Sequence, residues 1–367
     1  MLALALSVPD RGGLFETNRV ERLGDRIASA LESRNLASVD TARLRPTDSE
    51  LARPGTKLLL TLADPKGHEY VLKIAEPALV AAEVCAYELR QLGRRPVVPV
   101  RAVTVEVPSG GIVGGALKPF IEVDPEARLS NDTRTWSELQ RSVMLREHAW
   151  EYLLDNLDTN AGQYALLGAE SYPIDMDWDR AFASDGTSRL SRFAKYRSTL
   201  PNARTFLYVD YVEARISLNF GFLRAEARHI RRLPESRVRE ILERYAAVRF
   251  GTDAAAAREF VSRVLDRKRT IERDVQRFIG ELRAERRELS VGKPRGLAVR
   301  TRALGRRFWN TWQKALDAVG RGSVGTAARH VLKVVRSRAA LAGKHGGRMS
   351  SERRRPTHAG LHLLERK

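Results

Sequence analysis

Hydrophobic positions recur at helical spacing near the start of the chain and through much of its second half. In residues 17–35, Val20, Leu23, Ile27 and Leu31 are three or four residues apart, the spacing of one face of an amphipathic helix. Similar patterns predict further helices over residues 78–92, 134–157, 234–250 and 253–289.

Short apolar runs separated by turn residues predict a group of strands before the midpoint. Two such runs flank Asp64-Pro65-Lys66-Gly67, a sequence typical of the turn of a β-hairpin. Residues 97–107 and 110–123 predict two further strands joined by a glycine-rich turn. Residues 36–56 predict a polar connector, whereas residues 200–224 mix aromatic and β-branched positions and predict no clear element.

These patterns predict an α+β protein of 367 residues with two lobes and a tail. We expect four segments: an N-terminal helix and connector (1–55), a small β-rich lobe (56–123), a larger helical lobe (124–290) and a basic tail (291–367) that is partly helical and partly disordered.

Basic charge is concentrated in the expected tail. Residues 291–367 hold 19 of the 64 Lys and Arg and 3 of the 45 Asp and Glu, so the first 290 residues have 45 basic and 42 acidic residues. Such asymmetry indicates an appended segment that meets an anionic partner. Nucleic acid, a membrane surface and an acidic protein are the candidate partners, and a solvated extension is the alternative.

One stretch of the tail has the pattern of a basic amphipathic helix. In residues 297–319, apolar positions fall four residues apart while basic residues lie off that stripe. The apolar positions are Leu304, Phe308, Trp312 and Leu316, and the basic ones are Arg306, Arg307 and Lys314. A helix of this kind can lie on an anionic membrane or dock in a groove of another protein.

The sequence has no features of a disulfide-bonded protein, of a membrane-spanning helix or of a histidine metal motif. Cys85 is the single cysteine, so no internal disulfide forms, which fits a reducing compartment. No stretch approaches the ~20 apolar residues of a spanning helix, and the seven histidines form no spaced metal motif. We expect a cytoplasmic protein, with a packed thiol at position 85.

The densest polar chemistry lies between residues 155 and 179. The stretch holds the amides of Asn160 and Gln163 together with Asp155, Asp158, Asp175, Asp177 and Asp179. Carboxylates brought close together repel each other, so such a cluster predicts a cation among them. Mg²⁺ held by one or two carboxylates and by substrate phosphates is one such case. Ordinary turn and helix-cap roles are the alternative.

Other residues complete a constellation suited to phosphoryl transfer. Lys73 ends the run YVLKI, and strand alternation places it on the face opposite Leu72 and Ile74, from which it can reach phosphate oxygens. The next predicted helix carries Glu83 and Glu88, either of which could pair with this lysine.

Further along, Asp158 precedes Gln163 by five residues, the separation of a catalytic aspartate and a metal-binding amide in kinases. Asp175 and Asp177 lie twelve and fourteen residues beyond Gln163 in a strand-like stretch, and kinases have a second metal-binding carboxylate at the end of such a strand.

The stretches LREHAWEYLLDNLDTNAGQY and YPIDMDWDRAF, with AEVCAYELRQLGRRPVVPV before them, resemble the atypical branch of the protein-kinase-like superfamily over about residues 56–183. This branch includes HipA-type bacterial kinases, phosphoinositide kinases and CotH-type kinases. The resemblance implies a two-lobed kinase-like fold that binds ATP and Mg²⁺ and phosphorylates an acceptor that is a protein or a small molecule.

By position, the resemblance implies that Lys73 contacts phosphates and that Glu83 pairs with it. Asp158 matches the catalytic aspartate, and Gln163 stands where the family has a metal-binding asparagine. Asp177 is the first choice for the principal metal ligand, and Asp175 is the second.

The sequence departs from the family at several positions. Thr159 and Asn160 replace Arg-His, Gln replaces Asn at position 163, and no glycine-rich phosphate loop precedes Lys73. A pseudokinase that serves as a binding module therefore stays open. So does a helical protein associated with nucleic acid or membranes, in which the aspartates are turn residues.

Overall fold

The computed structural model of the chain describes eight stretches: residues 11–33, 36–50, 58–106, 111–121, 128–156, 161–178, 181–182 and 203–290. Side chains are not described at 11–17, 48–50, 58, 162 and 203–206. All these stretches belong to one compact unit, Met1–Pro294. The predictions for Asp158, for the turn before residue 111 and for the basic tail lie outside the described residues.

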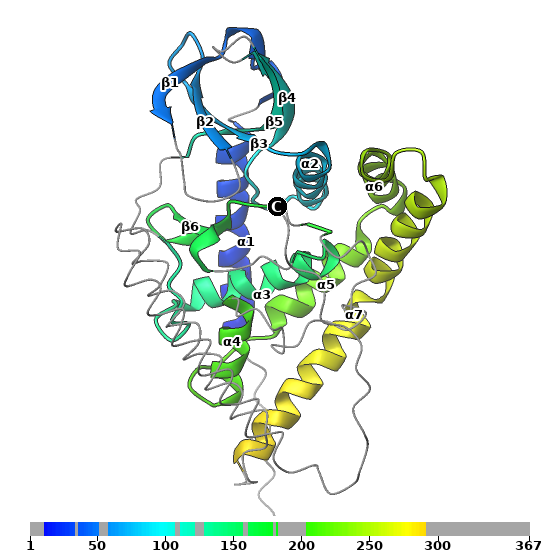
Figure 1. The fold of residues 1–367 in the computed structure, drawn as a ribbon. Coiled ribbons are helices and arrows are strands. Elements are labelled where there is room, and N and C mark those ends of the chain that lie inside the picture. Colours follow the sequence, from blue (N-terminus) through cyan, green and yellow to red (C-terminus); the bar gives the residue numbers. More distant parts are fainter. Residues whose placement is uncertain are drawn as a thin grey trace, which may run out of the picture. The chain divides into compact units, whose positions relative to one another are not determined.

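The N-terminal lobe is an antiparallel five-stranded sheet with the strand order β1-β2-β3-β5-β4 (Figure 1). Its strands are β1 (Arg45–Glu50), β2 (Leu58–Ala63), β3 (Glu69–Ile74), β4 (Arg101–Glu106) and β5 (Ile112–Pro119). One face of the sheet is covered by a small apolar cluster that includes Leu62, Leu72 and Leu117.

The predicted hairpin is present as β2 and β3, paired from Leu58 opposite Ile74 to Ala63 opposite Glu69. Its turn is closed by the side chain of Asp64, which accepts backbone hydrogen bonds at 2.9 Å from Lys66 and from His68.

The polar connector predicted over residues 36–56 was wrong in part, because it contains strand β1. Arg45 and Pro46 pair with β2, and the register shifts before Glu50. The strand is polar and lies at the edge of the sheet, so it has neither the alternation nor the apolar run by which strands are recognised in a sequence.

Seven α-helices are described. They are α1 (Arg11–Glu32), α2 (Pro77–Leu92), α3 (Glu138–Leu153), α4 (Ala203–Val212), α5 (Gly221–Arg232), α6 (Glu235–Phe250) and α7 (Ala254–Ser290). The helices predicted over residues 17–35, 78–92, 134–157, 234–250 and 253–289 are all present, whereas the one predicted over 297–319 lies outside the described residues. Helix α4 and the start of α5 lie in the stretch that the pattern did not assign.

The predicted helix over residues 134–157 is shorter at both ends. The side chain of Ser137 accepts the backbone N–H of Gln140, whose side chain accepts the N–H of Ser137. This capping box fixes the start of α3. At the other end Asp155 takes a positive φ of 51°, a conformation in which a helix cannot continue.

The helical lobe packs around α3 and α7 (Figure 1). His148 of α3 is fully buried and lies against the rings of Tyr208 and Phe278, so it is part of the core. After α3, strands β6 (Tyr164–Leu167) and β7 (Tyr172–Asp175) form a separate hairpin.

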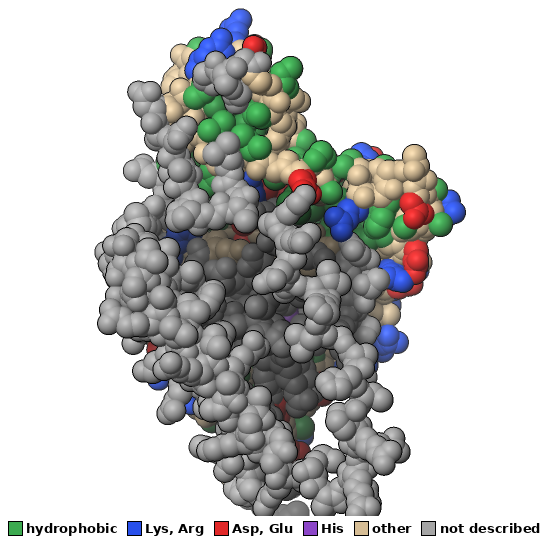
Figure 2. Space-filling model, viewed as in Figure 1, with side chains coloured by type: hydrophobic (Ala, Val, Ile, Leu, Met, Phe, Trp, Pro, Cys, Tyr) green, Lys and Arg blue, Asp and Glu red, His purple; other side chains and the backbone are tan. Residues whose placement is uncertain are grey.

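The α+β class is confirmed: a sheet lobe comes first and a mainly helical lobe follows. Figure 2 shows hydrophobic side chains over the sheet lobe and mixed basic and acidic side chains over α6 and α7. None of the described helices is long and apolar enough to span a bilayer.

Candidate functional site

Lys73 lies on the face of β3 that is directed away from the apolar cluster of the sheet. Its neighbour Leu72 is fully buried in that cluster, and Lys73 itself is only 4% exposed. Its ammonium contacts the carboxylate of Asp177 and lies 3.6 Å from Oε2 of Glu83. A lysine of the sheet lobe and an aspartate of the segment after β7 therefore meet.

Glu83 is the carboxylate of α2 that faces this lysine. It is 1% exposed, and its Oε1 accepts the backbone N–H of Trp178 at 3.3 Å. Glu88, the other candidate, is directed elsewhere and pairs with Arg244 of α6 at 2.6 Å. Five residues along a helix correspond to more than one turn, so the two carboxylates point in different directions.

A second lysine, Lys118 of β5, also reaches Glu83. Its ammonium pairs with Oε1 of Glu83 and donates a 2.8 Å hydrogen bond to the carbonyl of Met176. Lys118 was not among the residues predicted from the sequence. The signal was present in GGALKPF, where alternation along the strand separates Lys118 from Leu117, but which strand lies beside β3 could not be deduced.

Asp175 and Asp177 have different surroundings although they are two residues apart. Asp177 faces Lys73. Asp175 is 2% exposed, and its Oδ1 accepts the backbone N–H of Asp177 at 3.0 Å. Burial, together with the nearby carboxylates of Glu151 and Glu147, raises the pKa of Asp175 well above its usual value. Of the two aspartates, Asp177 is the one that contacts Lys73.

Gln163 ends a short 3-10 helix, Ala161–Gln163, directly before β6. Its backbone carbonyl accepts the N–H of Met176 at 3.1 Å, so it lies beside the segment that carries Asp177. Its side-chain Oε1 is buried and has no hydrogen-bond partner among the described residues. Asp158, the predicted catalytic residue, falls in the undescribed stretch before it.

The oxygen donors present are of the type that suits a hard divalent cation. Oxygen ligands from carboxylates and amides suit Mg²⁺, and Asp177, Asp175 and Gln163 supply them along two adjoining segments. Oδ2 of Asp175 is, like Oε1 of Gln163, buried without a hydrogen-bond partner in the described part of the chain. Within that part, no three His, Cys, Asp or Glu side chains form a metal-binding group.

Trp178 anchors this segment to the rest of the protein, as expected for a packing residue. It is 3% exposed, and the guanidinium of Arg90 lies over its ring at 4.8 Å from the centroid. Arg90 in turn donates to both carboxylate oxygens of Glu147 at 2.7 and 2.8 Å. Helix α2, helix α3 and the segment after β7 are thereby held together.

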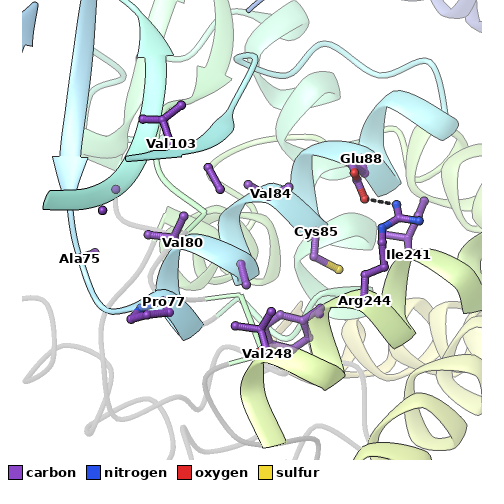
Figure 3. Close-up of a pocket in the computed structure, with 15 residues that line it drawn as sticks. Ala75, Pro77, Val80, Val84, Cys85, Glu88, Val103, Ile241, Arg244 and Val248 are labelled. Carbon is purple, nitrogen blue, oxygen red and sulfur yellow. Dashed lines mark hydrogen bonds and ion pairs between the residues drawn. The ribbon is translucent and has the colours of Figure 1, made fainter. Parts of the chain in front are cut away.

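Another face of α2 lines an apolar pocket that also involves β4, β5 and α6 (Figure 3). The cavity measures about 420 Å³ and includes Val80, Cys85 and Val248 in its lining. Cys85 is 2% exposed, so it is a packed thiol as predicted, and burial raises its pKa.

Models of known protein families give no match to the sequence, and no curated protein is significantly similar to it. Solved structures do show similarity. The Helicobacter pylori proinflammatory kinase CtkA is 14% identical with a TM-score of 0.41, covering 66% of this chain and 98% of its own.

Two further solved structures cover a comparable share of this chain. The Golgi casein kinase is 13% identical with a TM-score of 0.38, covering 70% and 77% of the two chains. An aminoglycoside phosphotransferase from Alicyclobacillus acidocaldarius is 12% identical with a TM-score of 0.29, covering 70% and 99%. All three TM-scores lie below 0.5, so the function proposed below rests on the contacts of the site itself.

Proposed function

We propose that the protein is an atypical kinase-like phosphotransferase that binds ATP with Mg²⁺ between the sheet lobe and the helical lobe. The observation that carries the proposal is the meeting of Lys73, Glu83 and Asp177, which are more than a hundred residues apart from first to last. In kinases a strand lysine holds phosphates, a glutamate on the next helix pairs with that lysine, and an aspartate after a later strand binds the metal.

Each side chain has a role in this proposal. Lys73 holds phosphate oxygens, and Glu83 keeps its ammonium in place. Asp177 is the main metal ligand, with Asp175 and Gln163 as supporting oxygen donors. Asp158 orients the acceptor hydroxyl, by its position in the sequence. The bound Mg²⁺ supplies positive charge that neutralises the phosphates.

The protein's contribution to catalysis is placement and charge. Phosphoryl transfer needs little covalent chemistry from the protein, so the gain comes from orienting the reactants and stabilising the developing charge. Lys73 contacts Asp177. In this proposal the ammonium would exchange that carboxylate for phosphate oxygens of the nucleotide.

Calorimetric titration with ATP, with and without Mg²⁺, tests the proposal. We expect binding that Mg²⁺ strengthens and that Lys73→Met weakens by about tenfold or more, since a charge-assisted hydrogen bond to phosphate is worth ~1.5–3 kcal/mol. Lys66→Met removes an exposed lysine from the β2–β3 turn and serves as the control that keeps wild-type affinity. Absence of ATP binding in the wild-type protein would overturn the proposal.

A pseudokinase is the second candidate, and Thr159, Asn160 and Gln163 favour it because they replace the residues usual at these positions. Transfer of labelled γ-phosphate to the protein itself, to protein substrates or to small hydroxyl acceptors separates the two. Metal-independent binding with neither transfer nor release of phosphate would identify a binding module.

A further inference from the structure

Two buried lysines on one face of the sheet share a single glutamate. Lys73 of β3 pairs in register with Ala116 of β5, and Val71 pairs with Lys118. Since alternate residues of a strand share a face, both lysines project from the same side of the sheet. Both ammonium groups reach the carboxylate of Glu83.

Lys118 connects three elements. It is 8% exposed, starts from β5, pairs with Glu83 of α2 and donates to the carbonyl of Met176. Met176 directly precedes Asp177 in the chain, and Glu83 also accepts the N–H of Trp178. The backbone on both sides of Asp177 is therefore held by the Lys118–Glu83 pair.

The charges explain why two lysines are present. Glu83 is buried whereas the side chain of Asp177 is 26% exposed, and removal of one partner of a buried pair leaves a charge without compensation. Lys73 makes its short contact with Asp177 and lies 3.6 Å from Glu83, whereas Lys118 makes the short contact with Glu83. Glu83 thus keeps a cation when Lys73 turns to another partner.

We infer that Lys118 is a positioning residue that fixes Asp177 for metal binding and frees Lys73 to move onto phosphate. The inference rests on the proposed function. Asp177 would hold the divalent ion and Lys73 would turn from Asp177 to the nucleotide phosphates, while Lys118 would continue to neutralise Glu83 and to hold the Met176 carbonyl. Lys118 acts through the metal ligand and contacts neither metal nor nucleotide.

If Lys118 has this role, its substitution should change how much Mg²⁺ is needed for ATP binding. Loss of a group that orients a metal ligand typically weakens metal binding by about 10–100-fold. Lys118→Met is therefore expected to raise the Mg²⁺ concentration for half-maximal ATP binding by at least about tenfold. Lys118→Arg keeps the positive charge and has enough N–H donors for both contacts, so it is expected to bring the Mg²⁺ midpoint most of the way back to the wild-type value.

Fluorescent ATP titrated with MgCl₂, using the full chain, measures this requirement. Lys268→Met is the matched control: Lys268 of α7 is also buried, at 3% exposure, and donates to one carbonyl, that of Arg231 at 2.7 Å. It is expected to lower stability without shifting the Mg²⁺ midpoint. If Lys118→Met does not fold, Lys118→Gln keeps a donor without the charge, and the same upward shift is expected.

The outcomes separate the two proposals. A wild-type protein that binds no ATP with Mg²⁺ overturns both. Wild-type binding with an unchanged Mg²⁺ midpoint in Lys118→Met overturns the role of Lys118 alone. An equal shift in Lys268→Met also overturns that role, because the midpoint would then report general loss of stability.

Discussion

At the scale of single residues, the closeness of β3 and β5 determines where Lys73 lies. A Cβ at Gly115 would lie 2.5 Å from the carbonyl oxygen of Lys73, so the two strands approach too closely there for any side chain. At Gly114 the nearest atom, the carbonyl oxygen of Val103, would be 4.0 Å away. Two adjacent glycines thus differ in what they tolerate.

Gly115→Ala is therefore expected to displace β3 and destabilise the protein by about 1–3 kcal/mol, the usual effect of overpacking. It should also weaken ATP binding, because Lys73 moves with its strand. Gly114→Ala, the neighbouring control, should leave both properties unchanged. Urea unfolding and ATP titration of the two variants measure this, and equal stabilities would show that the strands can separate without strain.

Asp158→Ala is expected to abolish phosphoryl transfer while it changes the free energy of unfolding by no more than ~1 kcal/mol. The reason is its position five residues before Gln163, which matches the catalytic aspartate of kinases. Transfer of labelled γ-phosphate measures the activity, and thermal unfolding of the same variant measures the stability. Transfer at the wild-type rate would remove Asp158 from the catalytic role.

Individual site residues could be predicted from the sequence where the local pattern alone determines which way a side chain points. Alternation was enough to direct Lys73 away from Leu72, and helix geometry offered Glu83 and Glu88 as its partners. The local pattern could not decide between these two, because the choice depends on how α2 packs: Glu88 pairs with Arg244 of α6. It missed Lys118 for a similar reason, since the adjacency of β3 and β5 is a long-range property of the sheet.

At the scale of elements, buried ion pairs fasten the helices that position the site. Glu226 of α5 is 1% exposed and accepts from Arg95 at 2.7 Å and from Trp150 of α3 at 2.6 Å. Burial alone would raise the pKa of Glu226, but the charges of Arg95 and Arg146 outweigh it, so that the pKa is lowered. The ionised carboxylate is thus the form that joins α5 to α3.

The sign of the pH dependence follows. A carboxyl group whose pKa is lower in the folded protein stabilises it above the pKa of the unfolded chain, about 4.3 for glutamate, and this stability is lost as the pH falls through the folded value. Glu226→Gln is expected to cost about 3 kcal/mol at pH 7, because Arg95 is left without its buried partner. Its stability should also fall less steeply in acid than that of the wild type.

Denaturant unfolding between pH 3 and 7 tests this expectation, with Glu88→Gln as the control. The Glu88–Arg244 pair also joins two helices, but its side chains are 32% and 52% exposed, so we expect a change below about 1 kcal/mol. Equal losses in the two variants, or an unchanged acid slope in Glu226→Gln, would contradict the role given to Glu226.

The elements predicted correctly from the sequence are those whose own residues show a clear hydrophobic pattern, without any contribution from neighbouring elements. α7 and the β2–β3 hairpin are examples. Strand β1 was not predicted because its pairing with β2 is what makes it a strand. Likewise α4 and α5 become helices among a core of aromatic and branched side chains, and their pattern alone did not distinguish helix from strand.

At the scale of the whole molecule, charge divides the chain into two parts. The first 290 residues hold 45 basic and 42 acidic residues, and they include every residue assigned above to the candidate ATP site. On α6 and α7 many basic residues are paired with acidic ones, as Arg239 and Arg269 are with Glu235. Most of the net charge of +19 therefore belongs to residues 291–367.

A chain that ends at Ser290 is accordingly expected to bind ATP with Mg²⁺ as tightly as the full protein but to lose retention on a polyanion such as heparin. For the full chain, the logarithm of affinity for a polyanion should fall linearly with the logarithm of salt concentration, because each neutralised phosphate or sulfate releases counterions. Anionic vesicles should behave similarly, with attraction of about 1 kcal/mol per basic residue near the surface.

ATP titration and salt-gradient elution of the two chains decide between the functions that the sequence left open. Retained ATP binding with lost polyanion binding would place the nucleotide site in the two lobes and assign the tail to an anionic partner. Loss of ATP binding in the shortened chain would favour the tail as the functional part and the aspartates as turn residues. Unchanged salt-dependent retention would instead show that the tail is a solvated extension, because the two lobes would then bind the polyanion by themselves.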